Sequence, residues 1–87
     1  MKFKDLIVHG EERFSIGIEE NTGRYYLSIP VSNSLIDYEE YYEISKDEFD
    51  AFSANVAAAV EFVRQCRSRR QDDRLFMKPG KDRGGAI

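Results

Sequence analysis

Residues 45–71, SKDEFDAFSANVAAAVEFVRQCRSRRQ, predict one long helix and decide the fold. Ser45, followed three residues later by Glu48, is a capping box, in which each side chain binds a free backbone N–H of the first turn. At about 100° per residue, six apolar side chains share one face about 100° wide, the width of a core-facing stripe. These are Phe49, Phe52, Val56, Ala59, Val60 and Val63. We therefore expect a single helix, starting at Lys46, that covers whatever precedes it.

From Arg13 onward, the residues before this helix alternate apolar and polar side chains, as strands with one buried face do, and Lys2–His9 contains a short apolar run. Phe14, Ile16 and Ile18 give the clearest alternation, and residues 21–23, Asn-Thr-Gly, are typical of a tight hairpin loop. The expected strands are Lys2–His9, a second from Arg13, Arg24–Val31 and Asp37–Ile44. Short connections favour antiparallel pairing in chain order. The sequence thus predicts an α+β fold, an antiparallel three- or four-stranded meander sheet packed on one long C-terminal helix.

The chain of 87 residues suffices for one domain with a modest core. We expect that domain over residues 1–78 and a mobile tail over residues 79–87, because Pro79-Gly80 breaks the chain and no periodicity follows. Phe62 lies about 100° from the apolar stripe of the expected helix. Residues 75–77, Leu-Phe-Met, are expected either to fold back onto it or to pack between molecules.

The composition places the protein among ordinary globular chains, with 41% hydrophobic and 33% charged residues. No apolar run of about 18 residues and no basic-then-apolar start is present, so we expect neither a membrane span nor a secretory signal. Cys66 is the single cysteine, which excludes an internal disulfide and fits a reducing compartment. A cytoplasmic location is therefore expected.

Charge is distributed unevenly along the chain. The net charge is −3, but residues 1–63 carry 13 acidic and five basic side chains, a balance of −8. Residues 64–87 carry eight basic and three acidic side chains, a balance of +5. The sequence thus predicts two oppositely charged regions, each suited to a partner of the opposite sign.

Residue types that carry catalysis or bind metals are sparse. His9 is the only histidine, so His/Cys metal clusters and paired-thiol chemistry are excluded. Adjacent carboxylates such as Glu11 and Glu12 point to opposite faces of a strand and make poor acid/base pairs. The glycines form no phosphate-binding loop. We therefore expect no enzyme activity, no cofactor and no metal.

Residues 37–44, Asp-Tyr-Glu-Glu-Tyr-Tyr-Glu-Ile, suggest a surface for a basic protein partner. As a strand, this segment places three acids and one tyrosine on one face, and clustered carboxylates attract cations while tyrosine is common in interfaces. The same pattern also fits the ordinary solvated side of a half-buried strand. The candidate partner-binding residues are Asp37, Glu39, Tyr41 and Glu43, with Glu19 and Glu20 nearby if that hairpin end adjoins them.

Two other functions stay open. Arginines between Arg64 and Arg74, with Lys78 and Lys81, could bind nucleic acid through its phosphates, although Asp72 and Asp73 interrupt the cluster. A structural or homo-oligomeric role is the second alternative.

The acidic, tyrosine-rich run at residues 38–43, in a small domain expected to combine a β-meander with one long helix, resembles small immunity proteins. These belong to bacterial contact-dependent growth inhibition and related polymorphic toxin systems. The resemblance covers roughly residues 13–63, and it assigns no residue a role by position. It implies a non-enzymatic inhibitor that binds one cognate toxin domain, often a nuclease, and blocks its active site.

Overall fold

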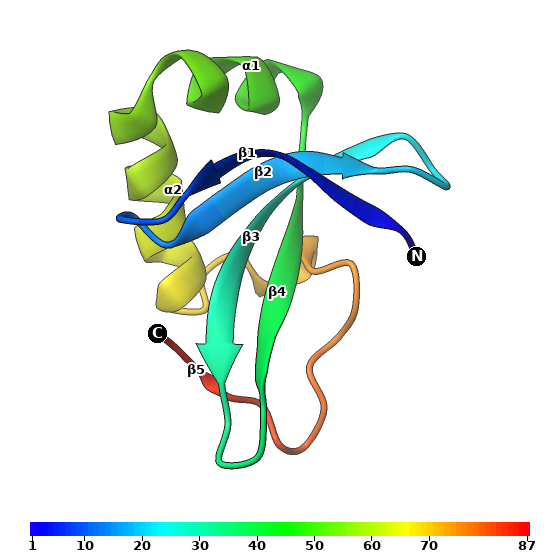
Figure 1. Ribbon diagram of the computed structural model, residues 1–87, viewed down its shortest axis with the longest axis vertical. Coiled ribbons are helices and arrows are strands. Elements are labelled where there is room, and N and C mark those ends of the chain that lie inside the picture. The colour runs from blue at the N-terminus through cyan, green and yellow to red at the C-terminus, as the bar shows by residue number, and fades with distance from the viewer.

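Four strands form where the sequence predicts them, and they pair antiparallel in chain order. The computed structural model, which describes residues 1–87, shows β1 (Phe3–His9), β2 (Phe14–Glu19), β3 (Arg24–Ser32) and β4 (Asp37–Ile44) (Figure 1). A two-residue strand, β5 (Gly85–Ala86), pairs with the end of β3. The predicted α+β fold and antiparallel sheet are therefore confirmed.

The predicted single long helix is wrong, because the chain breaks at Asn55 into α1 (Lys46–Ala54) and α2 (Val56–Arg67). The capping box at the start of α1 is present, with Ser45 Oγ accepting from the Glu48 amide at 3.0 Å. Asn55 has extended backbone angles, φ −143° and ψ 101°, and its Oδ1 accepts from the Ala57 amide at 3.0 Å. This residue ends one helix and caps the next.

The break changes which side chains of the second helix face the sheet. Phe62 and Cys66 are buried, whereas Val56, predicted to lie in the core-facing stripe, is 39% exposed. Figure 1 shows α1 lying across one end of the sheet and α2 running down beside it. Since α2 takes its own direction, its buried stripe is set independently of that of α1.

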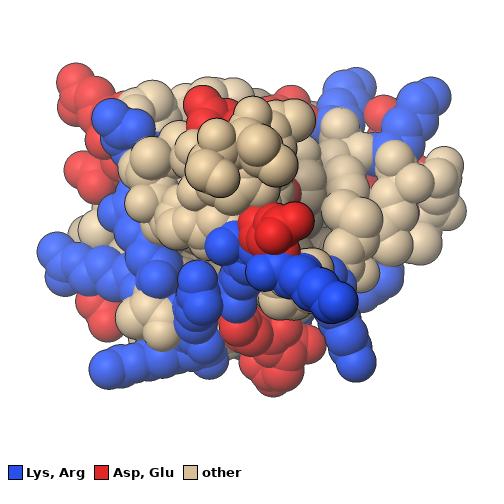
Figure 2. Space-filling model, turned by 90° about the horizontal axis from the view of Figure 1, so that it is seen from below, with Lys and Arg blue, Asp and Glu red and all other residues tan.

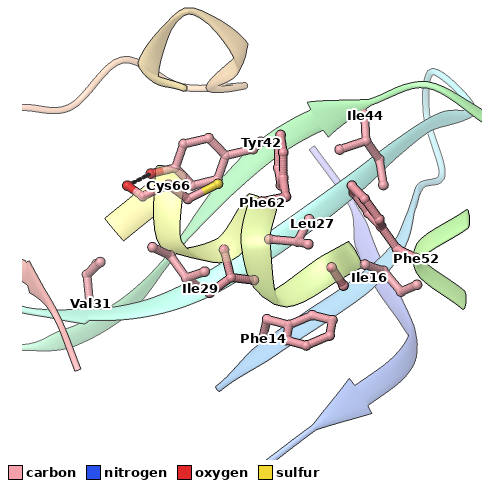
Figure 3. Packing of buried hydrophobic residues seen from close by; sticks show 12 residues of the cluster. Phe14, Ile16, Leu27, Ile29, Val31, Tyr42, Ile44, Phe52, Phe62 and Cys66 are labelled. Carbon is pink, nitrogen blue, oxygen red and sulfur yellow. Dashed lines mark hydrogen bonds between the residues drawn. The ribbon is translucent and has the colours of Figure 1, made fainter. Parts of the chain in front are cut away.

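The core lies between the sheet and the two helices. Alternate residues of β2, β3 and β4 point to it, so that Leu27 and Tyr42 are fully buried opposite Phe62 (Figure 3). The Tyr42 hydroxyl donates to Glu40 Oε1 at 2.9 Å and to the Cys66 carbonyl at 3.4 Å. The whole cluster consists of Phe14, Ile16, Leu27, Ile29, Val31, Tyr42, Ile44, Phe52, Ala59, Phe62, Val63 and Cys66.

The sheet is strongly coiled, so that β1 passes over the face that the helices leave free (Figure 1). The register shifts between Asp5 and Ile7, which makes Leu6 a bulge that bends β1. Gly17 permits the close approach: a β-carbon there would overlap the Lys4 carbonyl oxygen and lie 2.7 Å from the Tyr26 hydroxyl. A side chain at this position would push β1 off the sheet.

The C-terminal segment follows the sheet and does not leave it as a loose tail. After the short 3₁₀ helix η1 (Asp72–Arg74), the Phe76 amide donates to the Tyr41 carbonyl at 3.0 Å. We predicted a mobile tail over residues 79–87. In the structure this segment returns to the sheet, where the Arg83 side chain, 11% exposed, binds Glu40 and Asp72. Of the two alternatives for residues 75–77, packing within the molecule or between molecules, Leu75 and Phe76 follow the first.

None of the helices is both long and apolar enough to cross a lipid bilayer.

Candidate partner-binding surface

The predicted acidic residues of β4 lie on the sheet face turned away from the helices, here called the back face. In the register, Glu43 is opposite Tyr26, Tyr41 opposite Ser28, and Glu39 opposite Pro30. The intervening residues of β4 point into the core. The alternation of the sequence therefore predicts the sides of this strand correctly.

Half of the back face is closed by aromatic side chains. The Phe3 ring stacks on Tyr41 with centroids 3.7 Å apart, and Tyr26 and Phe76 meet Phe3 edge-on at 5.2 and 5.3 Å. Burial, together with the charges of Glu39 and Asp5, raises the pKa of Tyr41. Tyr41 is thus part of a second small core and is only partly available to a partner.

Glu43 is engaged at the rim of this aromatic cluster. The Arg24 guanidinium binds its carboxylate through two contacts, of 3.0 and 2.6 Å, and lies 4.4 Å from the centre of the Phe76 ring. The hydrogen bond from Arg24 lowers the pKa of Glu43. Glu43 therefore contributes less free negative charge to the back face than the sequence suggests.

Glu19 is fully buried and serves the fold. Its carboxylate accepts from the amides of Lys2, Asn21 and Thr22 at 2.8 to 3.0 Å and from the Thr22 hydroxyl at 2.7 Å. These hydrogen bonds, led by the one from Lys2, lower the pKa of Glu19 to about 2. Glu19 is consequently closed to a partner, whereas Glu20 is exposed at the β2–β3 turn.

The other half of the back face is open and carries carboxylates without a cationic partner. Asp5, Asp37 and Glu39 form no ion pair within the chain. Glu39 has only the Ser28 hydroxyl, at 3.4 Å, and Asp5 accepts from the Tyr26 hydroxyl at 2.6 Å. Burial, and then the charge of Asp5, raises the pKa of Glu39. No lysine or arginine of the protein pairs with these three carboxylates.

Most of the predicted basic region is occupied by contacts within the chain. Arg74 binds Glu48 at 2.9 Å and lies 5.1 Å from the centre of the Phe62 ring, and Arg67 donates to the Glu12 carbonyl. Arg69 donates to the Gly84 carbonyl at 3.5 Å. Figure 2, the view from below, shows basic side chains interspersed with acidic ones. These arginines therefore do not form the uniform, free basic patch that phosphate binding favours.

Cys66 and His9, the single cysteine and the single histidine, do not form a catalytic pair with each other. Cys66 is buried on α2, and desolvation raises the pKa of its thiol to about 12. The His9 ring stacks on Phe14, with centroids 4.8 Å apart. No group of three or more His, Cys, Asp or Glu side chains is placed to hold a metal ion.

A cleft of about 320 Å³ beside Glu39 could not be found from the sequence. One wall is the edge of β4 at residues 38–41, and the other is the C-terminal segment Met77–Arg83, here called the arch. Asp5 was also missed as a neighbour of the acidic strand. The sequence shows only that Phe3 and Asp5 fall on the same side of β1. Because β2 and β3 lie between β1 and β4, no local pattern connects Asp5 with the acidic strand.

No protein-family model, curated protein or solved structure matches this chain.

Proposed function

We propose that the protein acts by binding, without catalysis, and that its partner is a basic protein that docks on the open half of the back face. The proposed role is that of an immunity protein, which neutralises a cognate toxin domain, such as a nuclease, by covering it. The supporting observation is the unpaired set Asp5, Asp37 and Glu39. Other carboxylates of the sheet, those of Glu40 and Glu43, already bind an arginine.

A cation supplied by a partner would relieve the electrostatic cost at this site. The pKa of Glu39 is raised because burial and Asp5 disfavour its charged form. A lysine or arginine brought close would favour that charged form, so binding should strengthen as the pH rises through the range in which Glu39 ionises. Complementary charge of this kind chiefly accelerates association and imparts salt dependence.

Association kinetics on the captured partner test this proposal. The tagged chain is used to isolate its partner from cells of the source organism, and binding is then measured at low and high salt. Asp37→Lys and Glu39→Lys should each slow association about tenfold or more at low salt and flatten its salt dependence. Glu61→Lys makes the same charge change on the exposed side of α2 and should alter association by less than about twofold.

An acidic partner, or nucleic acid retained through Arg70 and its neighbours, would contradict the proposal. So would equal effects of Glu39→Lys and Glu61→Lys. The immunity role has a separate test in the genome: an adjacent reading frame should encode an exported protein with a variable C-terminal domain, and co-production of this chain should suppress the activity of that domain.

A further inference from the structure

The edge of β4 is only partly used by the chain. Residues along an antiparallel strand alternate in the side to which their backbone groups point. Because the Tyr41 carbonyl accepts from Phe76, the N–H and C=O of Asp37 and Glu39 also point away from β3. No turn, loop or cap hydrogen bond reaches these groups, and β3 lies on the other side of the strand. A short stretch of free strand edge therefore remains between the β3–β4 loop and the point where the C-terminal segment joins.

The arch leaves room beside this edge. The chain pairs with β4 at Leu75 and Phe76, departs at Met77, and returns where Arg83 binds Glu40 (Figure 1). Between these two attachments lies the cleft of about 320 Å³, at the lower end of the size range of ligand sites, about 300–1,000 Å³. A segment of extended chain in this cleft would lie against the backbone of Glu39, with Lys78 and Lys81 of the arch on its other side.

The side chains at this edge select the chemistry of such a segment. Asp37 and Glu39 project on the same face, two residues apart, and neither forms an ion pair within the chain. A strand added alongside would place its own alternate residues directly opposite these carboxylates. Lysine or arginine at those positions is favoured, and acidic residues are disfavoured.

From these observations we infer that β4 takes one further strand, an extended basic segment of the partner, whose backbone pairs with Asp37 and Glu39. This inference rests on the proposed function and specifies how the partner binds. Strand addition of this kind combines affinity from main-chain hydrogen bonds with selectivity from alternate side chains. A second copy of this chain fits poorly, because pairing two β4 edges would set Asp37 and Glu39 against the same acids.

The opposite edge of the sheet is less suited to the same partner. β1 is interrupted by the bulge at Leu6, and Lys2 and Lys4 are exposed beside it. Bulges and edge lysines are features that prevent strand addition. The loop before β4 adds apolar contact at its open end, since Leu35 and Ile36 are 84% and 61% exposed. Both of their amides donate to Asn33 Oδ1 at 2.8 Å, so this loop is pre-organised.

Backbone methylation of a model peptide separates strand addition from simple charge attraction. The probe is a short capped peptide of alternating lysine and valine, titrated into the isotope-labelled protein and followed by amide NMR and hydrogen exchange. Lysines opposite Glu39 and Asp37 exchange main-chain hydrogen bonds with β4, whereas valine amides point away. N-methylation of the lysines should therefore weaken binding about tenfold or more, and N-methylation of the valines should change it little.

The unmodified peptide should shift the amide signals of Asp37 and Glu39 and slow the hydrogen exchange of these amides. Equal binding by the two methylated peptides would overturn strand addition while leaving charge-driven docking on the back face intact. Absence of any change at the Glu39 amide would overturn the assignment of this edge. A different result would contradict the proposed function itself: association of the captured partner that is unchanged by Asp37→Lys and by Glu39→Lys.

Discussion

At the scale of single residues, three glutamates of similar sequence context have three different environments. Glu19 is surrounded by backbone N–H groups, Glu40 is held by Arg83, and Glu39 has no cationic partner. The pKa of Glu19 is lowered and that of Glu39 raised, because hydrogen bonds stabilise one charge and burial penalises the other. Neighbours, and not residue type, thus separate the carboxylates that stabilise the fold from those that have no cationic partner.

Glu19 predicts a specific pH dependence of stability. Its pKa in the folded protein, about 2, lies below the ordinary value of 4.5, so its ionised form stabilises the fold above that ordinary value. This contribution is lost as the pH falls from about 4.5 to about 2. Glu19→Gln should lower the urea midpoint at pH 7, and the difference from the unmodified protein should shrink towards pH 2. The exposed neighbour provides the control, since Glu20→Gln should have little effect at either pH.

At the scale of elements, Asn55 determines the angle at which the helices cover the sheet. The Asn55 amide donates to the Ala51 carbonyl at 2.9 Å, and its side chain caps α2. Residues 53–57 around it contain no proline or glycine, so the helix propensity of this segment does not predict a break. The burial of Phe62 and Cys66, which a straight helix would turn away, explains why the bent arrangement is retained.

Substitution at Asn55 should measure how much this cap contributes to the free energy of unfolding. Asn55→Ala removes the acceptor for the Ala57 amide and should cost about 1 kcal/mol of unfolding free energy, within the range of about 0.5–2 kcal/mol for caps. For a domain of this size, this corresponds to about 4–8 °C in the thermal midpoint. Asn55→Asp keeps an acceptor at a helix N-terminus and should be nearly neutral. A rise in helical circular dichroism with unchanged stability for Asn55→Ala would mean that the two helices fuse without penalty.

At the scale of the whole molecule, Arg83 fastens the C-terminal segment to the sheet. Its guanidinium makes two contacts with Glu40, of 2.7 and 3.1 Å, and two with Asp72, of 2.7 and 2.9 Å. Gly84 follows, with its amide donating to the Tyr38 hydroxyl at 2.7 Å. These contacts hold the far end of the arch, and therefore the cleft beside β4, in place.

Removal of Arg83 should destabilise the fold and release the arch. Arg83→Met leaves the nearly buried Glu40 carboxylate without its cation, which should cost on the order of 3–5 kcal/mol. The double variant Arg83→Met with Glu40→Gln should recover part of this loss, since the unpaired charge is gone. Thermal unfolding measures both, and Lys81→Met, an exposed residue of the arch, is the matched control. Equal midpoints for Arg83→Met and Lys81→Met would show that the ion pairs contribute nothing.

Local sequence determined the strands, the hairpin turns, the capping box at Ser45 and the side of β4 that carries the acids. These follow from periodicity and from contacts between residues a few positions apart, which the order of residues displays directly.

The availability of those acids was decided only by tertiary structure. Phe3 reaches Tyr41 because β1 coils over the sheet, Arg24 engages Glu43 across a strand pair, and Arg83 meets Glu40 from 43 positions away. Such contacts depend on coiling, register and chain return, to which many distant residues contribute together. The open carboxylates and the free edge of β4 are what remains after those long-range contacts have formed.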